Sequence, residues 1–263
     1  MILVIAGTKD GRDLITLLAK EYPVMASVFS DYGRDLLKLD NLSIHTGPLD
    51  SEGLTELIAN HNITLVVDAS HPYAVNVSKN TMQACKNSQI SYLRYERPCA
   101  TMPVYEKLYV VNDYLQAIER SASLGKVIFL TTGSRHLRLF KVAEGLQNHR
   151  LIARILPEAN VLTECLELGF SPQDIIALQG PFSHELNKAL FKDYQAEVIV
   201  TKNSGQIGGC DTKITAAMDL GLPIVLIDRP KIDYSQIVYG IEDVIQFVKE
   251  AQNHEIYNRT NDH

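Results

Sequence analysis

The chain has 263 residues, of which 46% are hydrophobic and 21% are charged, and its formal net charge is −6. This composition is typical of a globular protein with a buried core, and the negative charge argues against binding to nucleic acid or to an acidic membrane. No apolar run approaches the ~20 residues that cross a bilayer, and the four cysteines form no CxxC pair, which favours a reducing cytoplasm over a disulfide scaffold.

The first half of the chain alternates short apolar runs with helical patterns. The apolar N-terminal run is short, lacks a basic segment and leads into a loop, so we interpret it as a strand rather than a signal peptide. Strands are predicted over residues 2–6, 24–29, 41–46, 63–68, 91–94 and 108–111, and helices over 13–20, 51–60 and 75–87.

The second half repeats this alternation. Strands are predicted over residues 126–130, 150–155, 174–178, 198–201 and 223–227, and helices over 113–124, 137–143, 158–168, 185–194, 212–220 and 241–251. Such alternation indicates an α/β fold with two Rossmann-like domains, mainly parallel sheets and a cleft between the domains. We place the N-terminal domain at 1–112, the C-terminal domain at 113–251, and a frayed polar tail at 252–263.

Small and polar residues follow the first two strands, where dinucleotide folds bind their ligand. The turn from Gly7 to Arg12 does not fit G-x-G-x-x-G, so Thr8 either caps a helix or lies in a turn that approaches a phosphate. After the second strand, Ser30 and Arg34 favour binding of the 2′-phosphate of NADP, whereas the aspartate between them favours NAD. The alternative for each of these residues is a solvated turn.

Two further strand ends in the first half carry reactive or charged side chains. Ser70, His71 and Tyr73 follow the strand that ends at 68, which indicates either a helix start or a ligand site. Arg94 and Arg97 flank a tyrosine and a glutamate, so they form either a structural ion-pair cluster or a grip on carboxylates.

In the second half, two loops combine glycine with positive charge. Gly133, Ser134 and Arg135 follow one strand. The other loop contains Lys202 and leads to Lys213, and it also holds Ser204, Gly205, Gly208 and Gly209. Backbone N–H groups, a helix dipole and two lysines favour an anion here, the alternative being a tight turn with solvated lysines.

Seven segments together resemble the precorrin-6A reductase family of cobalamin biosynthesis. They are GTKDGR (7–12), DASHPYA (68–74), RYERP (94–98), TGS (132–134), QGPFS (179–183), TKNSG (201–205) and DRP (228–230). They run in order over nearly the whole chain. Ser70 stands where many members have threonine, and it keeps the hydroxyl group.

This resemblance implies an NADPH-dependent oxidoreductase that reduces one macrocycle double bond of precorrin-6A or its cobalt form. Cobalt would then belong to the substrate, and no protein metal site is implied. The expected partner is a tetrapyrrole with many carboxylates, and the protein is expected to be a monomer or a weak homo-oligomer. Because the cofactor carries the chemistry, the protein would mainly position its ligands.

Site residues follow as hypotheses. His71 and Tyr73 are candidate proton donors. The expected cofactor-binding residues are Gly7, Thr8, Arg12, Ser30, Arg34, Ser70, Gly133, Ser134 and Arg135. The expected substrate-binding residues are Arg94, Arg97, Lys202, Ser204, Lys213 and Arg229.

Two other functions were weighed against this one. A non-catalytic nucleotide-binding sensor on the same fold stays possible on fold alone. A methyltransferase of the same pathway is disfavoured, because no convincing glycine loop for S-adenosylmethionine is present.

Overall fold

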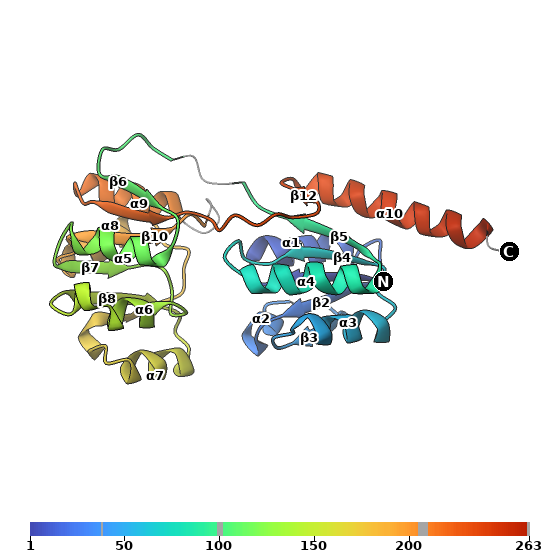
Figure 1. The fold of residues 1–263 in the computed structure, drawn as a ribbon, viewed down its shortest axis with the longest axis horizontal. Helices are drawn as coiled ribbons and strands as arrows, with labels where there is room; N and C mark the ends of the chain where they lie inside the picture. Colours follow the sequence, from blue (N-terminus) through green and yellow to red (C-terminus); the bar gives the residue numbers. More distant parts are fainter. Residues whose placement is uncertain (38, 99–101, 205–209, 262–263) are drawn as a thin grey trace. The chain divides into compact units, whose positions relative to one another are not determined.

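The computed structural model describes residues 1–37, 39–98, 102–204 and 210–261. The chain forms two compact units (Figure 1). Unit 1 comprises Met1–Pro98 and Lys231–His263, and unit 2 comprises Cys99–Pro230. Each unit contains a six-stranded sheet in which every recorded strand pair is parallel, so the predicted α/β fold with two Rossmann-like domains is confirmed.

The sheet of unit 1 has the strand order β12-β5-β4-β1-β2-β3. Its strands are β1 Ile2–Ala6, β2 Val24–Val28, β3 Ser43–Thr46, β4 Leu65–Ala69, β5 Ser91–Tyr95 and β12 Ile237–Val238. Its helices are α1 Lys9–Leu18, α2 Asp31–Asp35, α3 Ser51–Asn60, α4 Val75–Ser88 and α10 Ile241–Asn261.

Helices cover both faces of this sheet, which explains why β1, β2 and β4 are buried along their whole length. Leu14 of α1 and Val244 of α10 pack with one set of strand residues. Leu54 of α3 and Ala84 of α4 pack with the other set. The apolar N-terminal run is therefore the central strand of a buried sheet.

The sheet of unit 2 has the strand order β6-β11-β10-β7-β8-β9. Its strands are β6 Leu108–Val111, β7 Val127–Leu130, β8 Arg150–Ile155, β9 Ile175–Ala177, β10 Val198–Lys202 and β11 Ile224–Ile227. Its α-helices are α5 Tyr114–Ala122, α6 Leu137–Val142, α7 Ala159–Glu167, α8 His184–Asp193 and α9 Cys210–Asp219, and two 3₁₀ turns span Glu144–Leu146 and Pro172–Asp174.

Alternate residues of these strands face two helical layers. Phe129, Ile152 and Ile199 form a core with Phe191 of α8 and Ile214 of α9. The strand residues next to these in sequence face the opposite side of the sheet, because side chains alternate along a strand. That second side carries α5, which contacts β10 and β11, and α6, which packs beside α5.

The division of the chain differs from the expected domains at 1–112 and 113–251. β6, expected in the first domain, pairs with β11 of unit 2. β12 and α10, expected in or after the second domain, belong to unit 1, where β12 pairs with β5. α10 also continues to Asn261, past the expected helix end at 251. Strand pairing joins segments distant in sequence, so a scan along the chain misassigned these three elements. The cleft expected between the domains stays a prediction.

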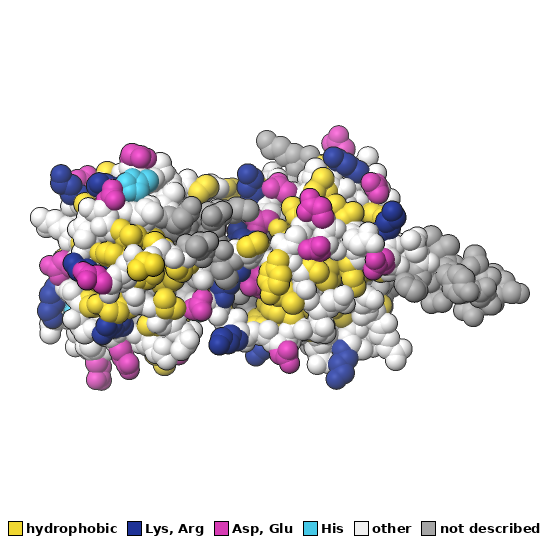
Figure 2. Space-filling view, turned by 90° about the horizontal axis from the view of Figure 1, so that it is seen from above, with side chains coloured by type: hydrophobic (Ala, Val, Ile, Leu, Met, Phe, Trp, Pro, Cys, Tyr) yellow, Lys and Arg dark blue, Asp and Glu magenta, His cyan; other side chains and the backbone are white. Residues whose placement is uncertain are grey.

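Surface charge is mixed on the face drawn in Figure 2, where Lys and Arg side chains lie among Asp and Glu side chains. No helix in the described part of the chain is both long and apolar enough to span a bilayer.

Strand order places one topological switch point in each sheet. In unit 1, β2 and β3 lie on one side of β1 and β4 lies on the other, so the switch point is between β1 and β4. In unit 2 the same reasoning places it between β7 and β10. Ligands of such sheets bind beyond the carboxyl ends of the strands at this point.

Candidate functional site

The switch point of unit 1 brings together two of the predicted turns. Gly7 and Thr8 follow β1, and Ser70 and His71 follow β4, its parallel neighbour. A small cavity lies at this edge of the sheet, lined by Thr8, Asp10, Ala69, Ser70, Pro72, Arg94, Tyr95 and Arg97. The predicted nucleotide turn and the turn that carries His71 are thus neighbours in space.

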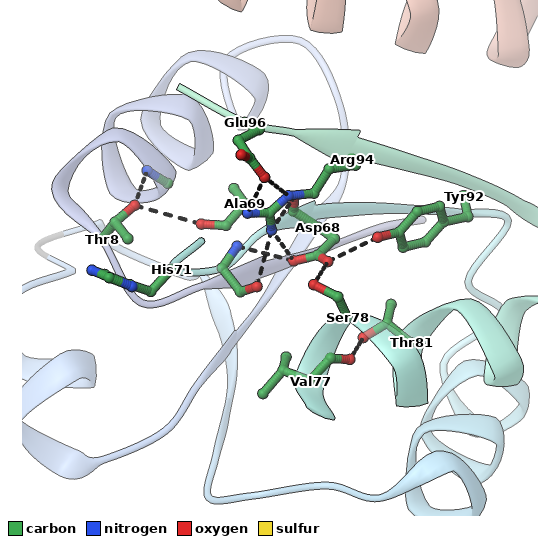
Figure 3. A network of polar contacts seen from close by, with 12 residues as sticks. Thr8, Asp68, Ala69, His71, Val77, Ser78, Thr81, Tyr92, Arg94 and Glu96 are labelled. Carbon is green, nitrogen blue, oxygen red and sulfur yellow. Dashed lines mark hydrogen bonds and ion pairs between the residues drawn. The ribbon is translucent and has the colours of Figure 1, made fainter. Parts of the chain in front are cut away.

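A buried polar network lies beneath these turns (Figure 3). Asp68 of β4 is fully buried, and it lies beside Arg94 of β5 in the strand register. Its Oδ1 atom accepts from Arg94 Nη1 at 3.0 Å and from the Ser70 backbone N–H at 3.0 Å. Its Oδ2 atom accepts from the hydroxyls of Ser78 at 2.6 Å and Tyr92 at 2.8 Å. The network ties the start of the Ser70–Tyr73 turn to the sheet.

Arg94 is one of the largest fully buried side chains of the structure. Besides Asp68, it donates from Nε and Nη2 to Glu96 Oε2 at 3.2 Å and from Nη1 to the Ser70 hydroxyl at 3.0 Å. Two carboxylates therefore balance its charge. The structure favours the alternative that the sequence left open for Arg94, a structural ion-pair cluster, over the expected contact with a substrate carboxylate.

Arg97 also meets a carboxylate inside unit 1. Its Nη1 atom lies 3.3 Å from Oδ2 of Asp10, and both side chains are buried. Asp10 is in the first turn of α1, where a negative charge interacts favourably with the helix dipole. Arg97 therefore lies beside the predicted nucleotide turn of unit 1.

The first turn of α1 has the features of a phosphate site. Thr8 is the N-cap, and its hydroxyl accepts from the Gly11 N–H at 3.1 Å. The N–H groups of Lys9 and Asp10 have no acceptor in the part of the chain that the structure describes. A Cβ atom added at Gly7 would meet nothing within 4 Å, whereas one at Gly11 would lie 3.1 Å from the Ala69 carbonyl oxygen. Gly7 thus leaves open space above the turn, and Gly11 lets α1 pack closely on the sheet.

The remaining cofactor candidates of unit 1 lie on helices α1 and α2. Arg12 is half-buried within α1. Ser30 caps α2 through the Gly33 N–H, and Arg34 pairs with Asp31 at 2.9 Å on the surface. Ser30 and Arg34 therefore follow the carboxyl end of β2, the position from which dinucleotide folds contact the ribose.

His71 and Tyr73 are half-buried neighbours, with ring centroids 5.6 Å apart. The Tyr73 backbone N–H donates to His71 Nδ1 at 3.3 Å. When Nδ1 is an acceptor, the proton of a neutral imidazole is on Nε2. His71 therefore presents Nε2–H as its donor.

At the switch point of unit 2, Lys202, Arg135 and His136 lie close enough for their charges to interact. Burial, followed by the nearby charge of Arg135, lowers the pKa of Lys202 to about 8. Burial and the charges of Lys202 and Arg135 also lower the pKa of His136. The His136 ring packs on Tyr114 of α5, with centroids 4.0 Å apart. Arg135, expected at the cofactor, thus lies near Lys202, expected at the substrate.

The other candidates of unit 2 lie close to these in sequence. Gly133 has φ +78, a conformation that favours glycine, and Ser134 accepts at its carbonyl from Leu137 at the start of α6. Lys213 is buried in α9, Ser204 is buried after β10, and Arg229 donates to the Asn203 carbonyl at 3.0 Å. Gly205, Gly208 and Gly209, expected in the same loop, lie outside the described residues.

Arg154 of β8 was not singled out from the sequence. It is 7% exposed, and its Nη1 atom donates to Asn187 Oδ1 at 2.8 Å. A signal was present, because Arg154 is a charged residue within the apolar run Leu151–Ile155 of a strand buried on both faces. Buried charges require partners, so a charged residue in such a strand indicates a functional site or a structural pair, as the charged loops do.

The family model described as precorrin-6x reductase CbiJ/CobK matches residues 1–249. A cobalt-precorrin-6A reductase of Priestia megaterium is 40% identical over 93% of this chain and 96% of its own length. A cobalt-precorrin-6A reductase of Methanothermobacter thermautotrophicus is 36% identical over 94% of this chain and 83% of its own length. A solved structure titled CobK precorrin-6A reductase superposes with a TM-score of 0.77 and 25% identity, over 95% of this chain and 96% of the other.

The family match spans both units, and the solved structure shares their fold over almost the full length. The chain therefore belongs to the precorrin-6x reductase family.

Proposed function

We propose that this chain reduces one carbon–carbon double bond of the cobalt-precorrin-6A macrocycle with a hydride from NADPH. The observation that carries the proposal is the family match over residues 1–249, together with relatives of 40% and 36% identity named cobalt-precorrin-6A reductase. Membership of a reductase family favours an enzyme over the non-catalytic sensor. The names of the relatives favour the cobalt form over the metal-free substrate.

In this proposal unit 1 holds the cofactor. The N–H groups of Lys9 and Asp10 and the open space above Gly7 fit a phosphate group at the N-terminus of α1. Ser30 and Arg34 would contact the 2′-phosphate, with Asp31 as the competing partner of Arg34. When bound, NADPH supplies the hydride, and the residues of the chain supply binding and orientation.

Unit 2 holds the acidic macrocycle. Burial and the nearby charge of Arg135 lower the pKa of Lys202, so an anion beside Lys202 would favour its charged form. The carboxylates of a tetrapyrrole are suitable anions, and a Lys or Arg side chain at each would fix the ring in place. Hydride transfer needs the two reacting carbons in near contact, which makes this positioning the main contribution of the protein.

The proton that accompanies the hydride comes from His71 in this proposal. To act as an acid the ring must be an imidazolium, so Nδ1 would take up a proton and give up the hydrogen bond that it accepts from the Tyr73 backbone N–H, and Nε2–H would then donate its proton. The Asp68–Arg94 network holds the preceding residue, Ser70, and so limits movement of the turn. A positioned general acid contributes about 10²- to 10⁴-fold in rate.

The function is tested with the purified chain, NADPH and both forms of the substrate in separate anaerobic reactions. We expect NADPH absorbance to fall and the cobalt-bearing product to gain the mass of a hydride and a proton. NADH in place of NADPH should raise the cofactor KM. Protein that binds NADPH but reduces neither macrocycle would refute the proposal.

A second experiment tests the proton donor by single-turnover hydride transfer. His71→Gln keeps a donor near the Nε2 position but cannot act as an imidazole acid, so its rate should fall by about 10²-fold or more. Tyr73→Phe is the matched control, because the contact to His71 comes from the Tyr73 backbone. An unchanged rate and pH profile in His71→Gln would remove His71 from the mechanism.

A further inference from the structure

Arg154 combines deep burial with a lack of counter-charge. The side chain is 7% exposed, and burial alone lowers the pKa of its guanidinium to about 10. No carboxylate of the described residues pairs with it, and Nη1 to Asn187 is its one hydrogen bond among them. A guanidinium has several N–H donors, so most of them have no protein acceptor there. Buried cations without a partner are costly, which marks Arg154 as unusual.

Neighbouring groups hold the guanidinium in one orientation. Its Cζ atom lies 4.4 Å from the ring centroid of Phe182 and 6.0 Å from that of Phe129. The Asn187 amide that accepts from it is itself fixed, since Asn187 Nδ2 donates to the Ser183 carbonyl at 2.8 Å. Stacking on an aromatic ring offsets part of the desolvation cost. The arrangement is a rigid donor fork rather than a loose surface arginine.

The position of Arg154 points to a ligand site. It is the penultimate residue of β8, at the carboxyl end of the strand next to the switch-point strand β7. Continuing the register by one residue puts Arg154, Thr131 and Thr201 at one level on one face of the sheet. The Thr201 hydroxyl is buried and has no hydrogen-bond partner among the residues that the structure describes. A second polar group without a partner therefore faces the same side.

Helix α8 adds positive potential at this place. Asn187 lies in its first turn, after the N-cap Ser183. Helix N-termini carry partial positive charge, which repels a guanidinium and attracts an anion. The described neighbours of Arg154 are thus aromatic, amide, hydroxyl and helix-dipole groups, a set suited to a bound oxyanion.

We infer that Arg154 binds an oxyanion of a ligand, a carboxylate or a phosphate, at the carboxyl edge of the unit 2 sheet. A carboxylate of the macrocycle is one source and a phosphate of NADPH is the other. The identity of the ligand rests on the proposed function, whereas the presence of an anion site does not. Arg154 and Thr201 lie on the face of the sheet that α8 and α9 cover. Lys202 follows Thr201 in β10, so its side chain lies on the opposite face. Arg154 and Lys202 would contact different groups.

The test measures binding, not turnover. Wild type, Arg154→Met and Arg154→Lys are titrated with NADPH and, separately, with uroporphyrin, a macrocycle that carries carboxylates on every pyrrole ring. Arg150→Met is the matched control, since Arg150 is on the same strand but pairs with Asp174 at 2.8 Å. We expect Arg154→Met to lower the affinity for one of the two probes by about 10- to 100-fold, because charge-assisted hydrogen bonds are lost. Arg154→Lys should recover part of the affinity.

The two probes distinguish the sources. Weaker uroporphyrin binding with unchanged NADPH binding assigns the site to a carboxylate, and the reverse pattern assigns it to a phosphate. If neither affinity depends on Arg154, including the case in which neither probe binds, the inference is wrong. Arg154-dependent binding in a protein that reduces neither substrate would instead refute the proposed function alone.

Thermal unfolding without ligand provides the second readout. A guanidinium kept for a ligand stabilises the free protein little, so Arg154→Met should unfold at the wild-type temperature or above it. A structural guanidinium predicts a clear fall in that temperature. A fall together with unchanged binding would show that Arg154 belongs to the core and would overturn the inference.

Discussion

Arg94 of unit 1 and Arg154 of unit 2 are both buried arginines on strands of parallel sheets, yet their surroundings differ. Arg94 lies beside Asp68 in the strand register and also contacts Glu96. Among the described residues, Arg154 contacts an amide and an aromatic ring and no carboxylate. Because a buried charge is costly until it is paired, the first arginine is satisfied by the fold itself and the second is not.

This difference indicates how to separate structural from ligand-binding arginines. The sequence left Arg94 open between an ion-pair cluster and a grip on carboxylates, and the family resemblance assigned it to the substrate. Arg154, within an apolar strand, was not singled out. Burial and pairing in the structure make Arg154 the better candidate for a ligand contact and Arg94 the better candidate for a structural role. Substitutions of these cations and of their partners test the difference between the two sites.

The largest effect is expected for Asp68→Asn. It breaks the buried Asp68–Arg94 pair and removes the carboxylate that accepts from Ser78 and Tyr92, so the free energy of unfolding should fall by about 3–5 kcal/mol. Urea titration followed by circular dichroism measures it. Adding Arg94→Met to Asp68→Asn should restore part of the lost free energy of unfolding. A double variant whose loss equals the sum of the two single losses would contradict the pairing.

A smaller effect, on substrate binding, is expected for Lys202→Met. Loss of one charge-assisted contact should raise the substrate KM by about tenfold, with a smaller change in the NADPH KM. In the wild type the substrate KM should rise as pH increases through about 8, where Lys202 loses its proton. The variant should lack this limb of the pH profile. A change confined to the NADPH KM would move Lys202 to the cofactor.

The same lysine makes a prediction about stability. Its pKa is about 8 in the folded chain and ordinarily 10.5, so the folded state releases the proton more readily. The resulting penalty is complete below pH 8 and disappears as pH rises to 10.5. Lys202→Met should therefore unfold at a higher temperature than wild type at neutral pH, with the difference shrinking toward pH 10.5. A difference that grows with pH would contradict the assignment.

Next in size is a contrast between two glycines of unit 1. An alanine Cβ at Gly11 meets the Ala69 carbonyl oxygen at 3.1 Å, so Gly11→Ala should destabilise the chain by about 1 kcal/mol. Gly7→Ala adds its methyl group to open space, so it should leave stability unchanged and raise the NADPH KM. Equal NADPH KM values for wild type and Gly7→Ala would argue against a phosphate at this turn.

The smallest effect is expected for a third arginine, Arg150. It pairs with Asp174 near the surface, its side chain being 39% exposed. Exposed pairs contribute little, so Arg150→Met should change the free energy of unfolding by less than about 1 kcal/mol. A loss as large as that of Asp68→Asn would show that exposure does not separate these arginines.

Much of the fold could be predicted from local sequence. Apolar runs such as 2–6 and 63–68 lie close to strands β1 and β4, and the turn residues Thr8, Ser30 and Ser183 lie at helix starts. These signals are local, because alternation and capping depend on neighbouring residues. Leu108–Val111 and Ile237–Val238 were misassigned or missed, since their partners, β11 and β5, are distant in the chain.

The sequence by itself determined two α/β units, their family and the strand ends that carry polar residues. Only the tertiary structure decided which charges are neutralised, because a carboxylate such as Asp68 approaches Arg94 through strand pairing across intervening residues. Adjacency along the chain reveals helix caps and turns. It does not reveal that Arg154 contacts Asn187 and Phe182, because those contacts depend on how β8 and α8 pack.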